Sequence, residues 1–258
     1  MSPPSAPSAP IPFKDHFSPN AAGYARHRPA YPPELASWLA GIAPSRSLAL
    51  DCGCGAGQFS TLLAEEFEQV VATDASPQQI AHARQHPRVR YGVAPAERSG
   101  LADASVDLVC AAQAAHWFDL PGFYDEARRV LRPRGCLALI SYGVARMDGE
   151  PGALLLDWHD RVLGPYWPPE RQRVRDGYRS LPFPFPEREA PPMNVAARWS
   201  LDELLGYVDT WSALRPALAA LGPETLETFR HNLARVWGTP GRPRNITWPL
   251  SLRVGCLP

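Results

Sequence analysis

The chain has 258 residues, a length that suits one domain with an insertion and allows a sizeable core. Lysine and arginine together number 26, as do aspartate and glutamate, so no net charge steers the protein toward nucleic acid. No apolar run approaches the roughly 20 residues that a membrane-crossing helix needs, so no membrane partner is expected either.

The N-terminal residues precede the first recognisable elements. Residues 1–12 hold five prolines, three serines and two alanines, with neither the basic nor the apolar part of a signal peptide. Such a composition predicts a disordered tail. Residues 13–46 are expected to form cap helices ahead of the first strand.

A glycine-rich turn follows the first predicted strand. An apolar segment ends in Asp51, and three glycines follow at alternate positions, Gly53, Gly55 and Gly57. Residues 59–67 then show the apolar spacing of a helix. Strand, glycine turn and helix in this order bring the backbone close to a nucleotide-like ligand.

The residues around this turn distinguish between ligand classes. A dinucleotide site of the form G-x-G-x-x-G would need glycine where Gln58 stands, and the lysine of a P-loop is absent. Asp51 would repel a pyrophosphate, whereas it would attract the sulfonium and ammonium of S-adenosylmethionine, which carries no phosphate. The alternative is a glycine-rich turn that binds nothing.

A second acidic residue ends the next predicted strand, residues 70–74. Asp74 follows Gly53 by about 20 residues, the separation at which a carboxylate accepts hydrogen bonds from ribose hydroxyls. The alternative is a helix start, because Ser76 and Pro77 open the next helical pattern. Both interpretations can hold at once.

Later segments continue the alternation of strands and helices. The further predicted strands are residues 89–94, 105–112 and 136–142. Together with a helix over residues 123–131 they predict a mostly parallel sheet with helices on both faces. Ligands of such sheets bind at the carboxyl ends of the strands, where Ala96, Glu97 and Gln113 fall.

In this order the motifs resemble the class I S-adenosylmethionine-dependent methyltransferases, in the group called type 11. The resemblance rests on the D-x-G-x-G-x-G loop, on Asp74, on Ala96-Glu97 and on Leu-Arg-Pro-Arg-Gly at residues 131–135. Residues 17–32 and 111–119 are similar to the branch that includes the trans-aconitate methyltransferases. The family implies a Rossmann-like α/β fold with a seven-stranded sheet, mostly parallel with an antiparallel last strand.

The resemblance also implies which residues bind S-adenosyl-L-methionine, with S-adenosyl-L-homocysteine as product. Asp51 would lie near the ammonium, Asp74 would accept from the ribose, and Arg28 would face the carboxylate of the cofactor. The implied set is Tyr24, Arg28, Asp51, Gly53, Gly55, Gly57, Asp74, Ala75, Ser76, Ala96, Glu97 and Gln113.

Residues 144–200 interrupt the alternation and are interpreted as a helical, aromatic lid over the substrate. The helical segments at residues 154–163 and 170–181 carry aromatic side chains that line a pocket or form the lid's own core. The arginines from Arg171 to Arg179 form a solvated helix face or, at one position, hold a carboxylate. The expected substrate contacts are Trp117, Trp158, Tyr166, Trp167 and Arg175.

Residues 201–258 complete a single domain over residues 13–258, in which residues 47–143 form the cofactor-binding core. In the C-terminal part, helices are predicted near residues 201–214 and 223–236, followed by a closing strand at residues 245–254.

The sequence favours a methyltransferase acting on a small molecule, with O-methylation of a carboxylate as the preferred reaction. A carboxylate needs a cation but no base, whereas a phenol or amine would need a general base, for which His116 is the candidate. His116 is otherwise a positioning residue in the loop after the fourth strand. N- or C-methylation of a metabolite, and a cofactor-binding scaffold without catalysis, are the alternatives.

The five cysteines bear on the compartment. Their number is odd and most lie within predicted strands, which favours reduced thiols in a cytoplasmic protein. Cys52 and Cys54 give only a C-x-C spacing, so no metal site is expected. The expected assembly is a monomer or a weak homodimer.

Overall fold

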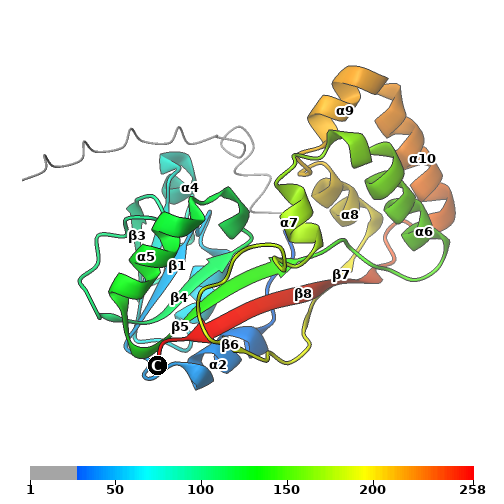
Figure 1. Cartoon of the computed structure of the whole chain (residues 1–258). Coiled ribbons are helices and arrows are strands. Elements are labelled where there is room, and N and C mark those ends of the chain that lie inside the picture. The colour runs from blue at the N-terminus through cyan, green and yellow to red at the C-terminus, as the bar shows by residue number, and fades with distance from the viewer. Residues whose placement is uncertain (1–27) are drawn as a thin grey trace, which may run out of the picture.

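The structure is a computed structural model that describes residues 28–258, so the expected tail at residues 1–12 lies outside it. A sheet of eight strands forms the centre, in the order β3-β2-β1-β4-β5-β8-β6, with β7 also paired to β8 (Figure 1). The strands are β1 Leu48–Cys52, β2 Gln69–Asp74, β3 Val89–Val93, β4 Val106–Ala112, β5 Leu131–Tyr142, β6 Glu187–Arg188, β7 Asn194–Trp199 and β8 Arg244–Cys256.

The strand directions confirm the predicted α/β architecture. The pairs among β1, β2, β3, β4 and β5 are parallel, and β8 runs antiparallel to β5. Residues of β1 and β4 are buried almost throughout, as expected for parallel strands covered on both faces. The carboxyl ends of β1, β2 and β4 therefore meet along one edge of the sheet, which positions the residues predicted there.

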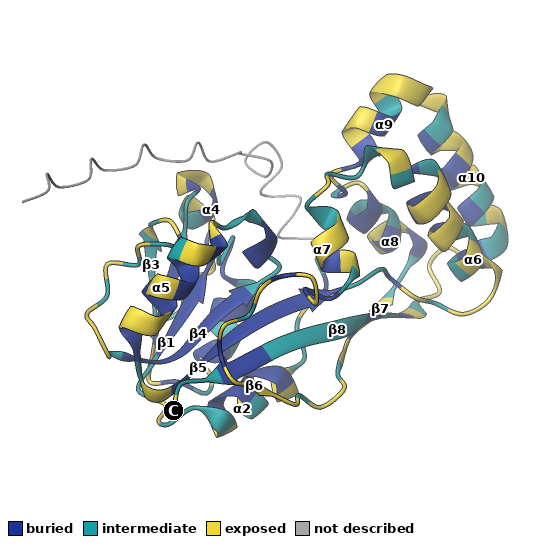
Figure 2. Cartoon of the chain, in the orientation of Figure 1, coloured by how far each residue is buried: buried dark blue, intermediate teal, exposed yellow. Residues whose placement is uncertain are grey.

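Helices cover both faces of the sheet. The central strands are accordingly buried, while the helices are exposed on their outward sides (Figure 2). Leu35 and Phe59 pack with α2 and α3 against one face, while Phe123 and Tyr124 of α5 pack against the other. The helices are α2 Pro33–Ile42, α3 Gln58–Leu63, α4 Pro77–Ala81, α5 Leu120–Val130, α6 Glu150–Asp157, α7 Arg171–Arg175, α8 Leu201–Val208, α9 Leu214–Leu221 and α10 Glu224–Trp237. Short turns of helix are η2 Ala115–Trp117, η3 Trp158–Val162 and η4 Gly164–Tyr166.

A separate core holds α6, α8, α9 and α10, called here the outer helices, beside the sheet (Figure 1). Trp158 stacks on Phe229 of α10 with ring centres 4.4 Å apart, and Trp248 of β8 donates a hydrogen bond to the Tyr207 hydroxyl of α8. Tyr142 at the end of β5 belongs to the same core. The outer helices are thus attached where β5 ends and β8 begins.

The segment predicted as a lid, residues 144–200, divides between two cores. Its first part joins the outer helices, whereas Val174, Tyr178 and Phe185 pack on the sheet face beside α5. Three elements were not predicted: α9, the two-residue strand β6, and β7, whose residues alternate weakly and include few β-branched side chains. β7 pairs with the first half of β8 and adds the eighth strand.

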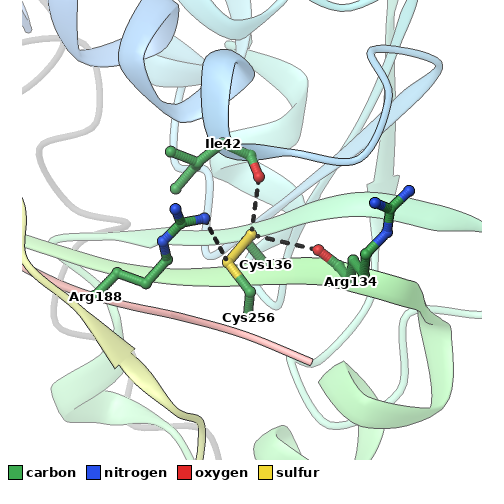
Figure 3. Close-up of a disulfide and its surroundings, with 5 residues drawn as sticks. All are labelled: Ile42, Arg134, Cys136, Arg188 and Cys256. Carbon is green, nitrogen blue, oxygen red and sulfur yellow. Dashed lines mark hydrogen bonds between the residues drawn. A yellow bond between two sulfur atoms is a disulfide. The ribbon is translucent and has the colours of Figure 1, made fainter. Parts of the chain in front are cut away.

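The expectation that all the cysteines are reduced thiols is wrong for one pair. Cys136 and Cys256 form a disulfide, while Cys52, Cys54 and Cys110 are free (Figure 3). The two bonded residues are direct partners in the antiparallel β5–β8 register, with Cα atoms 4.0 Å apart. Because 120 residues separate them in sequence, only the pairing of these strands brings them together. The cysteine count therefore does not support a reducing compartment.

Candidate functional site

Asp51 is a fully buried carboxylate near the end of β1. Its Oδ2 accepts a hydrogen bond from the Ser60 hydroxyl at 2.6 Å, and its Oδ1 has no hydrogen-bond partner among residues 28–258. Burial, with a smaller contribution from Asp74, raises the pKa of Asp51 to about 7. A cation placed beside Oδ1 would favour the charged form, so the site suits a positively charged ligand group.

The glycine loop beside Asp51 is closely packed. Gly53, Gly55 and Gly57 all have positive φ, between 54° and 77°. A Cβ on Gly53 would lie 2.5 Å from the Cβ of Ala114, and one on Gly57 would lie 2.2 Å from the Tyr91 hydroxyl. Side chains at these two positions would therefore collide with neighbours as well as strain the backbone. At its three glycines the turn therefore has backbone and no side chain near the buried Asp51 carboxylate.

Asp74 at the end of β2 fixes this loop. One carboxylate oxygen accepts from the backbone N–H of Gly55 at 2.9 Å, and the other accepts from the N–H of Ser76 at 2.8 Å. The Ser76 hydroxyl also accepts from the N–H of Gln79, so Ser76 caps α4. Both sequence interpretations of this segment are thus compatible: a cap at Ser76 and a carboxylate at the strand end.

The remaining predicted cofactor residues lie around the same edge. Ala96 is buried, and the carboxylate of Glu97 accepts from the backbone N–H of Asp119 at 2.9 Å. Gln113 follows β4 with a φ of 55°, and its side-chain amide donates to the carbonyl of Tyr142 at 3.1 Å. A non-glycine residue held at positive φ is strained, and such strain concentrates at functional sites.

A small cleft, open to solvent, lies between this edge and the outer helices. Its lining combines positive charge, hydroxyls and tryptophan rings, and no carboxylate is among the described residues that line it. The lining residues are Arg28, Gln113, His116, Trp117, Trp167, Pro168, Arg171, Thr210, Trp211 and Ser212. Since Gln113 belongs to both regions, the cleft adjoins the edge that carries Asp51 and Asp74.

Two arginines supply the charge of the cleft. Arg28 donates to the Tyr142 hydroxyl at 3.3 Å, and its guanidinium carbon lies 5.5 Å from the centre of the Tyr207 ring. Arg171 lies over the Trp167 ring, with its guanidinium carbon 5.1 Å from the ring centre. Two guanidinium groups, with no carboxylate among the lining residues of the described range 28–258, give this wall a positive charge that attracts anions.

His116 lies in the cleft wall as a neutral imidazole. Burial lowers its pKa to about 3, and the positive charges of Arg171 and Arg173 act in the same direction. Its Nδ1 lies 2.9 Å from the hydroxyl of Tyr178. At neutral pH such a histidine is a weak base, so its environment favours positioning over proton abstraction.

The structure brings only some of the expected substrate residues to the cleft. Trp117 and Trp167 line it, whereas Trp158 is buried against α10 and Tyr166 packs against the core of the outer helices. Arg175 lies 3.4 Å from Asp160 and is not among the lining residues. Tyr24 falls outside the described residues.

Sequence reasoning did not select several residues that do line the cleft. Arg171 belonged to the considered arginine run, but the helical pattern could not show which arginine faces inward. The sequence feature that could have singled out Arg171 is Trp167, four residues earlier, because the Arg171 guanidinium lies over the Trp167 ring. No sequence motif marks Thr210, Trp211 and Ser212 as site residues, because only the packing of the outer helices brings them to the cleft.

The described part of the chain holds neither a metal-binding cluster nor a membrane-spanning helix. Within residues 28–258, no cluster of histidine, cysteine, aspartate and glutamate has the arrangement of a metal site. In that same range, no helix has both the length and the apolar character needed to span a bilayer.

Comparison with known proteins gives consistent matches. A family model described as a methyltransferase domain matches residues 50–139. A protein of Dictyostelium discoideum, named provisionally as a methyltransferase, is 32% identical and covers 90% of this chain and 91% of its own length. A solved structure from Anaeromyxobacter dehalogenans, described provisionally as a type II methyltransferase, is 50% identical with a TM-score of 0.86, covering 90% of this chain and 99% of that chain. A malonyl-[acyl-carrier protein] O-methyltransferase of Pectobacterium atrosepticum is 35% identical over 46% of this chain and 47% of that protein.

Proposed function

This chain belongs to the class I methyltransferases, and we propose that it transfers the methyl group of S-adenosyl-L-methionine to a carboxylate oxygen of a small molecule. When bound, this donor supplies a methyl group on a sulfonium that is already a good leaving group. The observation that carries the proposal is the pairing of a buried, half-satisfied carboxylate at Asp51 with an adjoining cleft that holds Arg28 and Arg171.

The donor side of the site suits a cationic nucleoside. Asp51 would hold the ammonium, since Oδ1 is a buried acceptor without a partner among the described residues. The carboxylate of Asp74 would accept from the ribose hydroxyls, beside its bonds to the loop. Ala75, Ser76, Ala96 and Glu97 would surround the adenine, and Gln113 would form the floor under the sulfonium.

The acceptor side suits an acid better than a phenol or an amine. A carboxylate is nucleophilic without losing a proton, so it needs a cation to hold it and no base. Arg171 offers that cation in the cleft, while His116, with its pKa lowered to about 3 by burial, is poorly suited to act as a base. The partial relative from Pectobacterium is an O-methyltransferase by name, which agrees with oxygen as the accepting atom.

The contribution of the protein to the reaction is then orientation and exclusion of water. Arg171 would hold the acid, while Trp117, Trp167 and Trp211 would cover part of its surface and shield that part from solvent. Holding the acceptor in line with the reacting bond can supply several kcal/mol of the barrier, up to about 7–11 kcal/mol in model systems.

The test is transfer of radiolabel from methyl-tritiated S-adenosylmethionine to a panel of small carboxylic acids, each with its carboxamide as a matched control. We expect label on acids and none on amides, and brief alkali should release it as methanol because methyl esters hydrolyse readily. Label that survives alkali would instead show methylation at nitrogen, carbon or a hydroxyl oxygen, and would refute ester formation. Calorimetry with S-adenosylhomocysteine tests the donor separately, and a wild-type protein that binds neither nucleoside would refute the proposal.

A further inference from the structure

Helix α7 ends in a turn that determines where Tyr178 lies. The N–H of Gly177 donates to the carbonyl of Val174 at 3.1 Å, and the N–H of Tyr178 donates to the carbonyl of Arg173 at 2.8 Å. These two bonds form a Schellman motif with Gly177 at the left-handed position. A Cβ on Gly177 would lie 2.5 Å from the Ser251 hydroxyl, so the turn packs tightly on β8.

Tyr178 itself has a φ of 64°, a value that a bulky residue rarely adopts. Its side chain is fully buried, and its hydroxyl lies 2.9 Å from Nδ1 of His116. Arg173 on the same helix donates to the backbone carbonyl of His116 at 3.3 Å. A strained backbone and two bonds thus converge on one histidine, and backbone strain of this kind persists where the surrounding structure enforces it.

The direction of the bond between these two side chains follows from their chemistry. A phenol donates a hydrogen bond more readily than it accepts one, and a neutral imidazole has one nitrogen that accepts and one that donates. With Nδ1 accepting from Tyr178, the proton of His116 resides on Nε2. Nε2 makes no hydrogen bond within residues 28–258, although His116 lines the cleft beside Arg171.

We propose that Tyr178 is a positioning residue that holds His116 as the Nε2–H tautomer, so that His116 donates a hydrogen bond to the carboxylate of the methyl acceptor. The identity of that acceptor rests on the proposed function, whereas the tautomer does not. His116 and Arg171 would bind the carboxylate oxygen that does not attack, which leaves the lone pairs of the other oxygen free for the methyl group.

The first test reads the tautomer directly, by 15N-resolved NMR of histidine-labelled wild-type protein at neutral pH. His116 is assigned with a His116→Gln variant, and it should show Nε2–H with an unprotonated Nδ1. Tyr178→Phe should make the ring a mixture of tautomers. Tyr124→Phe is the matched control, since it removes another buried hydroxyl bond on the same sheet face, to the Pro182 carbonyl, and should change nothing. An Nδ1–H form or an imidazolium in the wild-type spectrum would overturn the proposal, whatever the variants do.

The second test separates a donor from a base by steady-state kinetics with the best acid found. Tyr178→Phe should raise KM for the acid about fivefold to tenfold, with kcat within about twofold of wild type. His116→Gln retains a side-chain N–H and should keep most of the affinity that His116→Ala loses. Equal loss of kcat in the glutamine and alanine variants, with KM unchanged, would identify a base and refute the donor role. If wild-type protein methylates no acid, the proposed function fails, while the NMR result still decides the tautomer.

Discussion

Replacing Asp51 with asparagine should stabilise the ligand-free protein relative to wild type as the pH rises. The same substitution removes the charge proposed to hold the donor. The carboxylate is fully buried, and one of its oxygens has no hydrogen-bond partner in the described part of the chain. Folding therefore favours its protonated form. The substitution keeps an acceptor for the Ser60 hydroxyl and abolishes the ionisation.

The magnitude follows from the pKa. Burial is the main cause that raises the pKa of Asp51 from 3.8 to about 7. Between about pH 4 and pH 7 the folded state keeps a proton that the unfolded chain has released, so wild-type stability falls as pH rises through this window. A difference of about 3 in pKa corresponds to about 4 kcal/mol, of which about 3 kcal/mol is lost between pH 5 and pH 8. Asparagine does not titrate, so the variant lacks this loss.

Urea unfolding at intervals from pH 5 to pH 8 measures the effect. The free energy of unfolding of Asp51→Asn, minus that of wild type, should increase by about 3 kcal/mol across the series. Any fixed cost of burying the asparagine amide is independent of pH and cancels. Asp125→Asn on the exposed face of α5 is the charge-matched control. Parallel stability curves for Asp51→Asn and wild type would show that Asp51 does not titrate in this range.

Three further predictions concern the loop, the disulfide and the outer helices. Asp74→Ala should weaken S-adenosylhomocysteine binding at least about tenfold by calorimetry, because the N–H groups of Gly55 and Ser76 lose their acceptor. Cys256→Ser should make the melting temperature insensitive to dithiothreitol, whereas reduction should destabilise wild type by about 2–4 kcal/mol. Trp158→Ala should cost about 3–5 kcal/mol in urea unfolding yet leave donor affinity unchanged.

The sheet could be predicted from the sequence because its signals are local. Strands β1, β2 and β4 are short and mostly apolar runs. A polar residue or a turn marks the place where each run stops. The glycine loop needs positive φ values and close contact between its backbone and neighbouring side chains. Glycine meets both requirements best, so the sequence itself indicates this loop. Residues 51–76 alone therefore predict the loop and the two carboxylates that are proposed to bind the donor.

The remaining elements depend on contacts between distant segments. The helix predicted at residues 170–181 is only five residues long, because Gly177 ends it in a left-handed turn against β8. Strand β7 forms only because β8 offers a paired edge, and the disulfide forms only because β5 and β8 are in register. None of these pairings leaves a pattern within its own segment, so a single sequence does not reveal them.

The same division applies to the chemistry of the site. The residues proposed to bind the donor come mainly from the first two strands and their loops, whereas the cleft draws on Arg28 and on three further segments, residues 113–117, 167–171 and 210–212. Substitutions in the last two segments would alter the wall proposed to contact the acceptor, without changing the loop beside Asp51. Acceptor specificity can therefore change independently of donor binding, provided that Arg171 keeps its place over Trp167. Under the proposed function, the packing of the outer helices and α7 would decide the class of acceptor, and the local sequence after β1 would decide the class of donor.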